Sequence, residues 1–228
     1  MLRRREFLAM TGVGGAALLS KIGLTANKNS SQEERNMAYT AKDYAKLLGL
    51  AGFSDTLLKN HFTLYQGYVT NTNKVLDALA AMLKDGKTGT PEFAELKRRL
   101  GWEFNGMRLH EYYFENLGGK AALNANGQLA KKMAASFGGY EAWEKDFKAV
   151  GTMRGIGWAV LYEDATNGQL INFWINEHDT GHPAGCRPIL IMDVFEHAFM
   201  IDYGLKRADY IEAFFKNIDW QAAEARLK

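Results

Sequence analysis

The chain has 228 residues, enough for one large domain or two small ones, and 47% of them are hydrophobic and 24% charged. That composition is typical of a globular protein and excludes a collagen, a coiled coil or a wholly disordered chain. Residues 1–26 hold four cations and one anion, so the formal charge of +2 becomes about −1 without them. The rest has no basic excess for nucleic acid, and the single cysteine excludes an intramolecular disulfide.

Residues 1–26 are predicted to be a targeting segment outside the fold. Three arginines precede Phe7 and Leu8, and a Gly- and Ala-rich run follows that is too short to span a bilayer. The pair Arg4-Arg5 before Phe7-Leu8 resembles the twin-arginine export signal of bacteria. A short basic amphipathic helix is the alternative. We therefore expect a periplasmic or otherwise exported protein, with no stable membrane anchor once the signal is removed.

The stretch 27–37 is polar and aperiodic and is predicted to be a flexible linker. Residues 38–125 are predicted to form a helical-hairpin domain, with long amphipathic helices over 53–86 and 90–119. A short loop between two long helices makes them antiparallel neighbours. The helix starts are predicted at Ser54 or Asp55 and at Thr90, which Pro91 follows.

Residues 126–228 show a change of period and are predicted to form a C-terminal α/β domain. Two shorter helices fit 127–151, and apolar or alternating runs separated by turn compositions then indicate strands. The predicted strands cover 156–164, 170–178 and 187–193, and a last helix covers 208–218. The fold class is therefore α+β, a helical hairpin followed by an α/β domain with three strands.

Four ionisable residues point to a metal site. His61 and His110 lie midway along the two long helices, and Asp193 and His197 stand four positions apart in the apolar run "IMDVFEHAF". Burying such groups unpaired costs several kcal/mol, so they bind a metal or form a hydrogen-bonded pair. A single histidine of this kind is usually a core residue, but the set favours a metal. Three imidazoles and one carboxylate suit Mn or Fe, and also Zn, although structural zinc usually recruits cysteine.

The block "DVFEHAFMIDYGLKRADYIEAFFKNIDW" closely resembles the C-terminal signature of the iron/manganese superoxide dismutases. The segments "GIGWAVL", "HEYYFENL" and "FSDTLLKNHFTLYQGYV" resemble further segments of that family, and the resemblance covers roughly residues 40 to 225. It implies a helical hairpin followed by an α/β domain with a three-stranded antiparallel sheet. It also implies one Fe or Mn ion per subunit between the two domains, with His61, His110, Asp193 and His197 as its ligands.

The resemblance implies further site residues. His178 and Tyr68 would form an outer hydrogen-bonded network that relays protons, Trp158 would wall the cavity, and Arg207 would attract superoxide. The alternative for His178 is a surface loop histidine. Glu196 would reach the ligand histidine of a second subunit, which implies a homodimer, although a solvated helix charge is the other interpretation.

Several positions depart from the family pattern. The first helix is one residue shorter and lacks two histidines, which makes Tyr65 a competitor of Tyr68 for the outer position. Met200 stands where the family has Tyr, Phe195 where it has Trp, and Ala208 where it has Pro. His182, in a Gly- and Pro-containing loop, is predicted to be a solvated surface histidine.

These features predict a superoxide dismutase, which converts superoxide to dioxygen and hydrogen peroxide by redox cycling of one Fe or Mn ion. The alternative is a periplasmic metal-binding or interaction protein of the same fold with lost or altered activity, suggested by the changes at Tyr65 and Met200. A zinc-loaded inactive form is a third hypothesis.

Overall fold

The structure, a computed structural model, describes residues 38–228. The predicted export signal, with Arg4 and Arg5, and the predicted linker at 27–37 lie outside the described residues. Within the described range, no helix is both long and apolar enough to cross a bilayer.

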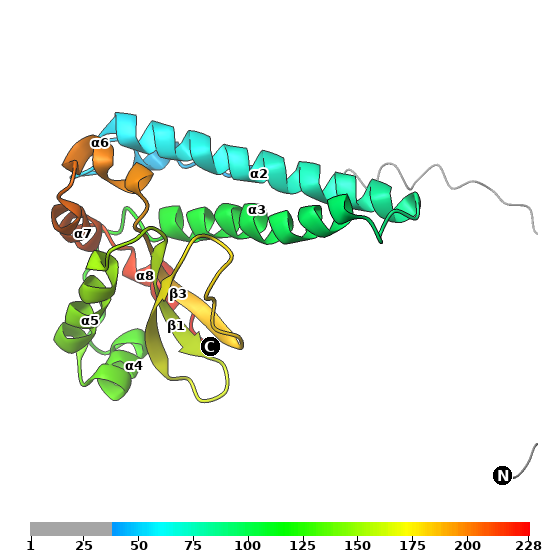
Figure 1. Ribbon diagram of the computed structural model, residues 1–228. Helices are drawn as coiled ribbons and strands as arrows, with labels where there is room; N and C mark the ends of the chain where they lie inside the picture. The colour runs from blue at the N-terminus through cyan, green and yellow to red at the C-terminus, as the bar shows by residue number, and fades with distance from the viewer. Residues whose placement is uncertain (1–37) are drawn as a thin grey trace, which may run out of the picture. The chain divides into compact units, whose positions relative to one another are not determined.

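Two long helices, α2 (Asp55–Lys84) and α3 (Pro91–Glu115), form an antiparallel hairpin whose connected ends project past the sheet (Figure 1). The Ser54 hydroxyl accepts a hydrogen bond from the Leu57 N–H and begins α2, and Thr90 begins α3 in the same way. Each cap satisfies a backbone N–H that has no partner within its helix. The helix α2 packs along α3, and its buried residues are Leu57, Leu58, His61, Tyr65, Val69, Thr72, Val75 and Leu79.

Three antiparallel strands form one sheet in the order β2-β1-β3. They are β1 (Trp158–Asp164), β2 (Leu170–Ile175) and β3 (Cys186–Asp193). Trp158 pairs with Ile175 on one side and with Asp193 on the other, so the register places the start of β1 beside the end of β3. β1 and the second half of β3 are almost wholly buried, which explains their continuous apolar sequence.

Strand β2 ends three residues earlier than the predicted strand over 170–178. Glu177 adopts a left-handed backbone conformation with φ of 59°, and Asn176 and Thr180 form an isolated bridge. A non-glycine residue in this conformation costs about 1–2 kcal/mol. The chain therefore turns before His178, which leaves the strand and points its side chain into the interior.

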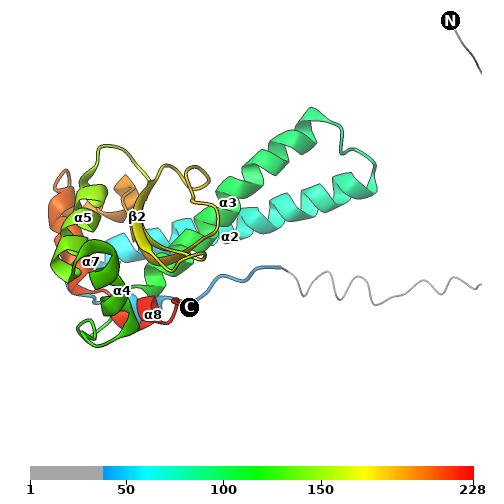
Figure 2. The same cartoon turned by 90° about the horizontal axis from the view of Figure 1, so that it is seen from below.

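The remaining helices cover the sheet and close the site. In Figure 2, α4 and α5 lie beside the sheet. The helix α3 contacts β3. These elements are η1 (Ala45–Leu47), α4 (Gln128–Phe137), α5 (Tyr140–Thr152), η2 (Glu196–Ala198), α6 (Met200–Tyr203), α7 (Arg207–Lys216) and α8 (Trp220–Glu224). The functional side chains lie where the hairpin meets the end of β3.

Candidate metal centre

Four ligand-type side chains from four different elements converge in the interior. They are His61 of α2, His110 of α3, Asp193 at the end of β3 and His197 of η2, and their ligand atoms all lie within 4.8 Å of one another. His61, His110 and Asp193 have no exposed surface, and His197 is partly exposed. The set predicted from the sequence is therefore brought together in space.

One carboxylate oxygen lies at the middle of the cluster. Asp193 Oδ2 is 3.2 Å from His61 Nε2, 3.1 Å from His197 Nε2 and 3.7 Å from His110 Nε2. The other oxygen, Oδ1, accepts the backbone N–H of Phe195 at 2.8 Å, which fixes the orientation of the carboxylate. Four ligand atoms thus face one small volume, with the orientation of the carboxylate set by the backbone.

The tautomer of His110 shows that the cluster suits a cation. Its Nδ1 is 2.6 Å from the Gly106 carbonyl oxygen, and a carbonyl only accepts, so Nδ1 carries the proton. The lone pair of Nε2 then points into the cluster, where this buried atom has no hydrogen-bond partner. An unpaired buried acceptor is costly, and a bound metal ion would satisfy it.

The protonation states also suit metal binding. Burial lowers the pKa of His61 and of His110, so both imidazoles are neutral near pH 7. Burial would raise the pKa of Asp193, but the charge and hydrogen bonds of His197 and His61 hold it well below its usual range. Burial would lower the pKa of His197, and the Asp193 carboxylate raises it instead. Neutral imidazoles and an ionised carboxylate are the ligand forms that metals need, so His61, His110 and Asp193 have these forms already. At His197 a metal ion would compete with the proton that Asp193 favours.

A second hydrogen-bonded network lies against the cluster. The Trp158 Nε1–H donates to His178 Nδ1 at 3.1 Å, and His178 Nε2 is 2.7 Å from the Tyr68 hydroxyl oxygen. Burial lowers the pKa of His178 to about 4, so the ring is neutral and carries one proton. Tryptophan can only donate, so that proton is on Nε2 and is donated to Tyr68. The hydroxyl proton of Tyr68 remains free to be donated elsewhere.

The structure places Tyr68, and not its competitor Tyr65, beside His110 and His178. The Tyr68 ring stacks on His110 with centroids 5.2 Å apart. Tyr65 instead donates its hydroxyl to Glu111 at 3.0 Å and accepts the Lys42 backbone N–H at 3.0 Å. Tyr65 therefore belongs to a different polar cluster.

Sequence reasoning missed Gly106, which lies one helical turn before His110. A Cβ at this position would lie 2.5 Å from the Tyr68 ring, so glycine is what allows the close approach of that ring. The same residue supplies the carbonyl that fixes the His110 tautomer. The sequence does show that Gly106 lies four residues before His110, and so on the same face of the helix. The meaning of this glycine is clear only once the position of the Tyr68 ring is known.

His182 differs from the sequence prediction. It is half-buried rather than solvated, its Nδ1 is 2.7 Å from the Tyr162 hydroxyl, and its Nε2 is 2.7 Å from the His178 carbonyl oxygen. The loop around it folds back on the sheet, which the Gly- and Pro-containing sequence did not indicate.

Arg207 lies at the start of α7, and its hydrogen bonds are to the segment between α5 and β1. Its guanidinium donates to the Met153 carbonyl at 2.7 Å and to the Gly155 carbonyl at 2.8 Å, and it lies over the Phe199 ring. It lines a surface depression together with Arg154, Lys206 and one acidic residue, Asp209, so cations outnumber anions there. A concentration of positive charge at this surface is consistent with attraction of a small anion.

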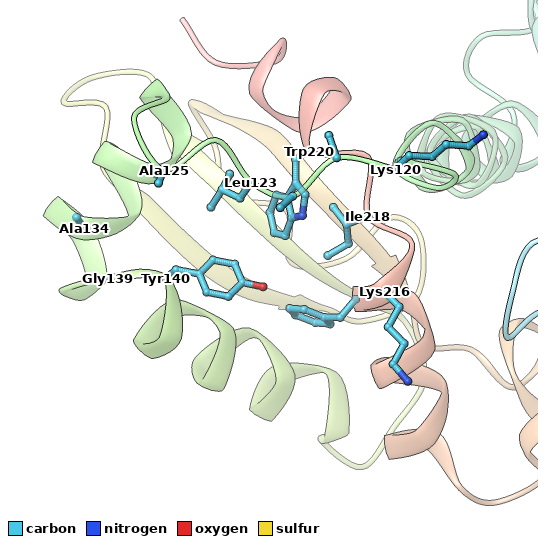
Figure 3. Close-up of a pocket in the computed structure, with 14 residues that line it drawn as sticks. Lys120, Leu123, Ala125, Ala134, Gly139, Tyr140, Lys216, Ile218 and Trp220 are labelled. Carbon is cyan, nitrogen blue, oxygen red and sulfur yellow. The ribbon is translucent and has the colours of Figure 1, made fainter.

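A separate surface cavity of about 640 Å³ lies between α4, α5 and the chain around Trp220 (Figure 3). Small and aromatic side chains line it, among them Ala134, Tyr140 and Phe215, with Lys120 and Lys216 at its rim. None of its lining residues belongs to the metal cluster or to the network of Trp158, His178 and Tyr68.

Comparison with known proteins agrees with this geometry. Residues 125–226 match the family model for the C-terminal domain of iron/manganese superoxide dismutases. The manganese superoxide dismutase 2 of Haloferax volcanii is 36% identical over 74% of this chain and 83% of its own length. The iron superoxide dismutases of Aquifex pyrophilus and Cupriavidus metallidurans are 34% and 37% identical, over 82% and 78% of this chain and 90% of their own lengths. The chain belongs to the iron/manganese superoxide dismutase family.

Proposed function

We propose that the chain is a superoxide dismutase that holds one Fe or Mn ion per subunit through His61, His110, Asp193 and His197. The observation that carries this is the His110 lone pair, which is buried, unpartnered and directed at a carboxylate and two further imidazoles. When bound, the ion supplies a one-electron oxidation of one superoxide to dioxygen and a one-electron reduction of a second, which with two protons gives hydrogen peroxide.

The protein's own residues hold and deliver protons. His178 donates to the Tyr68 hydroxyl oxygen, so the hydroxyl proton is not used in this bond and is available to another acceptor. Burial, with the charges of Asp193 and Glu103, raises the pKa of Tyr68 to about 12, which keeps the hydroxyl protonated at neutral pH. Trp158 is fully buried beside His110 and excludes bulk water from that side. Arg207 would attract the anionic substrate toward this side of the protein.

The relatives include both iron and manganese enzymes, so reconstitution tests the function and the metal together. Metal-free chain is loaded separately with Fe, Mn and Zn, the bound metal is measured by mass spectrometry, and superoxide consumption is measured per bound ion. We expect catalysis with Fe or Mn and none with Zn, which has no accessible redox couple. Full loading with Fe and with Mn and no consumption in either case would instead support a metal-binding protein of this fold.

We further propose that two copies form a dimer through the surface around Glu196. This carboxylate is exposed and directly precedes the ligand His197, and the exposed apolar side chains of Met200, Ile201 and Leu205 follow in α6 and the next turn. Exposed apolar side chains gathered in one place are typical of an interaction surface. Glu196 would then accept a hydrogen bond from the partner subunit's His197 and orient it. Light scattering with the variant Glu196→Ala tests this, with loss of dimer and of bound metal as the expected result.

Export remains a proposal that rests on the sequence of residues 1–26. Its support is the Arg4-Arg5 pair followed by Phe7-Leu8. A signal of this kind carries folded proteins, which suits a chain loaded with metal before transport. Replacing both arginines by lysine is expected to retain the protein in the cytoplasm, as measured by cell fractionation. Equal export of this variant would contradict the assignment.

A further inference from the structure

The position of the His178 ring depends on a short turn after β2. Glu177 in this turn has a left-handed backbone, and Asn176 and Thr180 bridge across it. The ring has a fixed partner on each nitrogen, Trp158 at 3.1 Å and Tyr68 at 2.7 Å. A contact of about 3.6 Å is no longer a hydrogen bond, so a shift of the turn that draws the ring away from either partner would break that bond.

A pair of side chains outside this network anchors the turn. The His178 carbonyl can only accept, so His182 Nε2 carries a proton and donates it at 2.7 Å. In the neutral ring, Nδ1 is then the acceptor for the Tyr162 hydroxyl, also at 2.7 Å. Tyr162 lies on β1 and is only 3% exposed. The register of β1 against β3 shifts just before it, between Leu161 and Tyr162. The chain of donors thus runs from the sheet through His182 to the His178 backbone.

We propose that Tyr162 and His182 are positioning residues that hold the His178 peptide, so that the imidazole reaches Trp158 and Tyr68 at once. This inference rests on the proposed function, because it assigns the pair a role in the proton relay of the same site. Neither residue belongs to the four-residue metal cluster, and both were outside the predicted site. The pair acts on the reaction only through the placement of His178.

The first test measures kcat per bound metal ion, with metal content and thermal stability recorded for every variant. We expect His182→Leu to lower kcat about tenfold without loss of metal, a typical effect of removing an outer hydrogen-bond partner. His182→Gln should return kcat to within about twofold, because its amide N–H reaches the same carbonyl. Tyr162→Phe should lower kcat by a smaller factor and should add nothing in the His182→Leu background, because both act through one chain of bonds.

Tyr140→Phe is the matched control, because it removes a half-buried tyrosine hydroxyl that lines the separate cavity near Trp220, and it should leave kcat unchanged. Unchanged kcat in fully metallated His182→Leu, or failure of His182→Gln to restore it, would overturn the proposal. If His182→Leu does not fold, Tyr162→Phe decides in its place, and a kcat equal to that of Tyr140→Phe would overturn the proposal.

The second test is independent of activity. In a crystal structure of metal-loaded His182→Leu we expect His178 Nε2 to lie farther than about 3.5 Å from the Tyr68 hydroxyl. An unchanged separation would overturn the inference even if the enzyme is active. If the unsubstituted chain is fully metallated but inactive, the proposed function is refuted. The distance from His178 Nε2 to the Tyr68 hydroxyl would still test whether His182 positions His178.

Discussion

At the scale of single residues, the site is defined by which atom of each side chain carries a proton. The Gly106 carbonyl leaves His110 Nε2 free as a ligand, and Trp158 makes His178 a donor to Tyr68. These assignments follow from groups that can only accept or only donate. They also separate the two tyrosines of α2 that the sequence left as competitors.

Replacing Tyr68 by Phe should lower kcat, whereas replacing Tyr65 by Phe should lower stability. Tyr68→Phe removes the hydroxyl beside the cluster, and we expect kcat to fall about tenfold or more with metal content unchanged. Tyr65→Phe leaves kcat unchanged but lowers the free energy of unfolding by about 1–3 kcal/mol, because the buried Glu111 loses a donor. Stopped-flow kinetics and urea unfolding separate the two. A larger loss of kcat in Tyr65→Phe would reverse their assignment.

The low pKa of His178 predicts a specific pH dependence of stability. Burial holds it at about 4 in the folded protein, below its ordinary 6.5, so between these values the unfolded chain binds a proton that the folded chain does not. The free energy of unfolding should therefore decrease as pH falls from about 6.5 to 4, by up to about 3 kcal/mol from this residue. Above pH 6.5 the contribution is constant.

Urea unfolding of the metal-free chain and of His178→Gln, each from pH 7 to 4, checks this sign. Protonation of the ligand residues is common to both, so the difference between them isolates His178. We expect the unsubstituted chain to lose more stability than the variant over this interval. Equal losses would mean that His178 is not held neutral by burial.

At the scale of elements, much of the fold could be predicted from the sequence, because caps and periodicity are local. The two helices begin where the side chains of Ser54 and Thr90 accept a backbone N–H, with Pro91 at the first position of α3. Two of the predicted apolar runs form β1 and β3. The early end of β2 could not be predicted, because "INEH" has no glycine or proline and the turn depends on the left-handed Glu177. The half-buried state of His182 depends on Tyr162, 20 residues away.

The close contact between α2 and α3 predicts different effects for two glycine substitutions. Gly106→Ala places a Cβ against the Tyr68 ring, so we expect a displaced ring and a kcat lowered about tenfold. Gly67→Ala on α2 meets nothing within 4 Å and should stabilise the helix by about 1 kcal/mol with kcat unchanged. Kinetics and thermal melting of both variants give the comparison. Unchanged kcat in Gly106→Ala would show that the ring tolerates the added methyl group.

At the scale of the whole molecule, the site exists only when α2, α3, β3 and η2 have packed together. His61 and Asp193 are 132 residues apart in the chain, yet their side chains are 3.2 Å apart. The sequence predicted these ligand residues through their types and the family resemblance. The same resemblance named Tyr68, His178 and Trp158 around them. It could not predict the parts of Gly106 and Tyr162, because their contacts depend on how distant elements pack.

The central claim is that these four residues hold the ion that dismutes superoxide. The most direct measurement is the catalysed rate of superoxide loss in stopped-flow, with bound metal determined in the same samples of unsubstituted chain and His110→Ala. We predict fast loss of superoxide by the Fe- or Mn-loaded chain, and loss of metal together with activity in folded His110→Ala. Full metal content and full activity in His110→Ala would contradict the account.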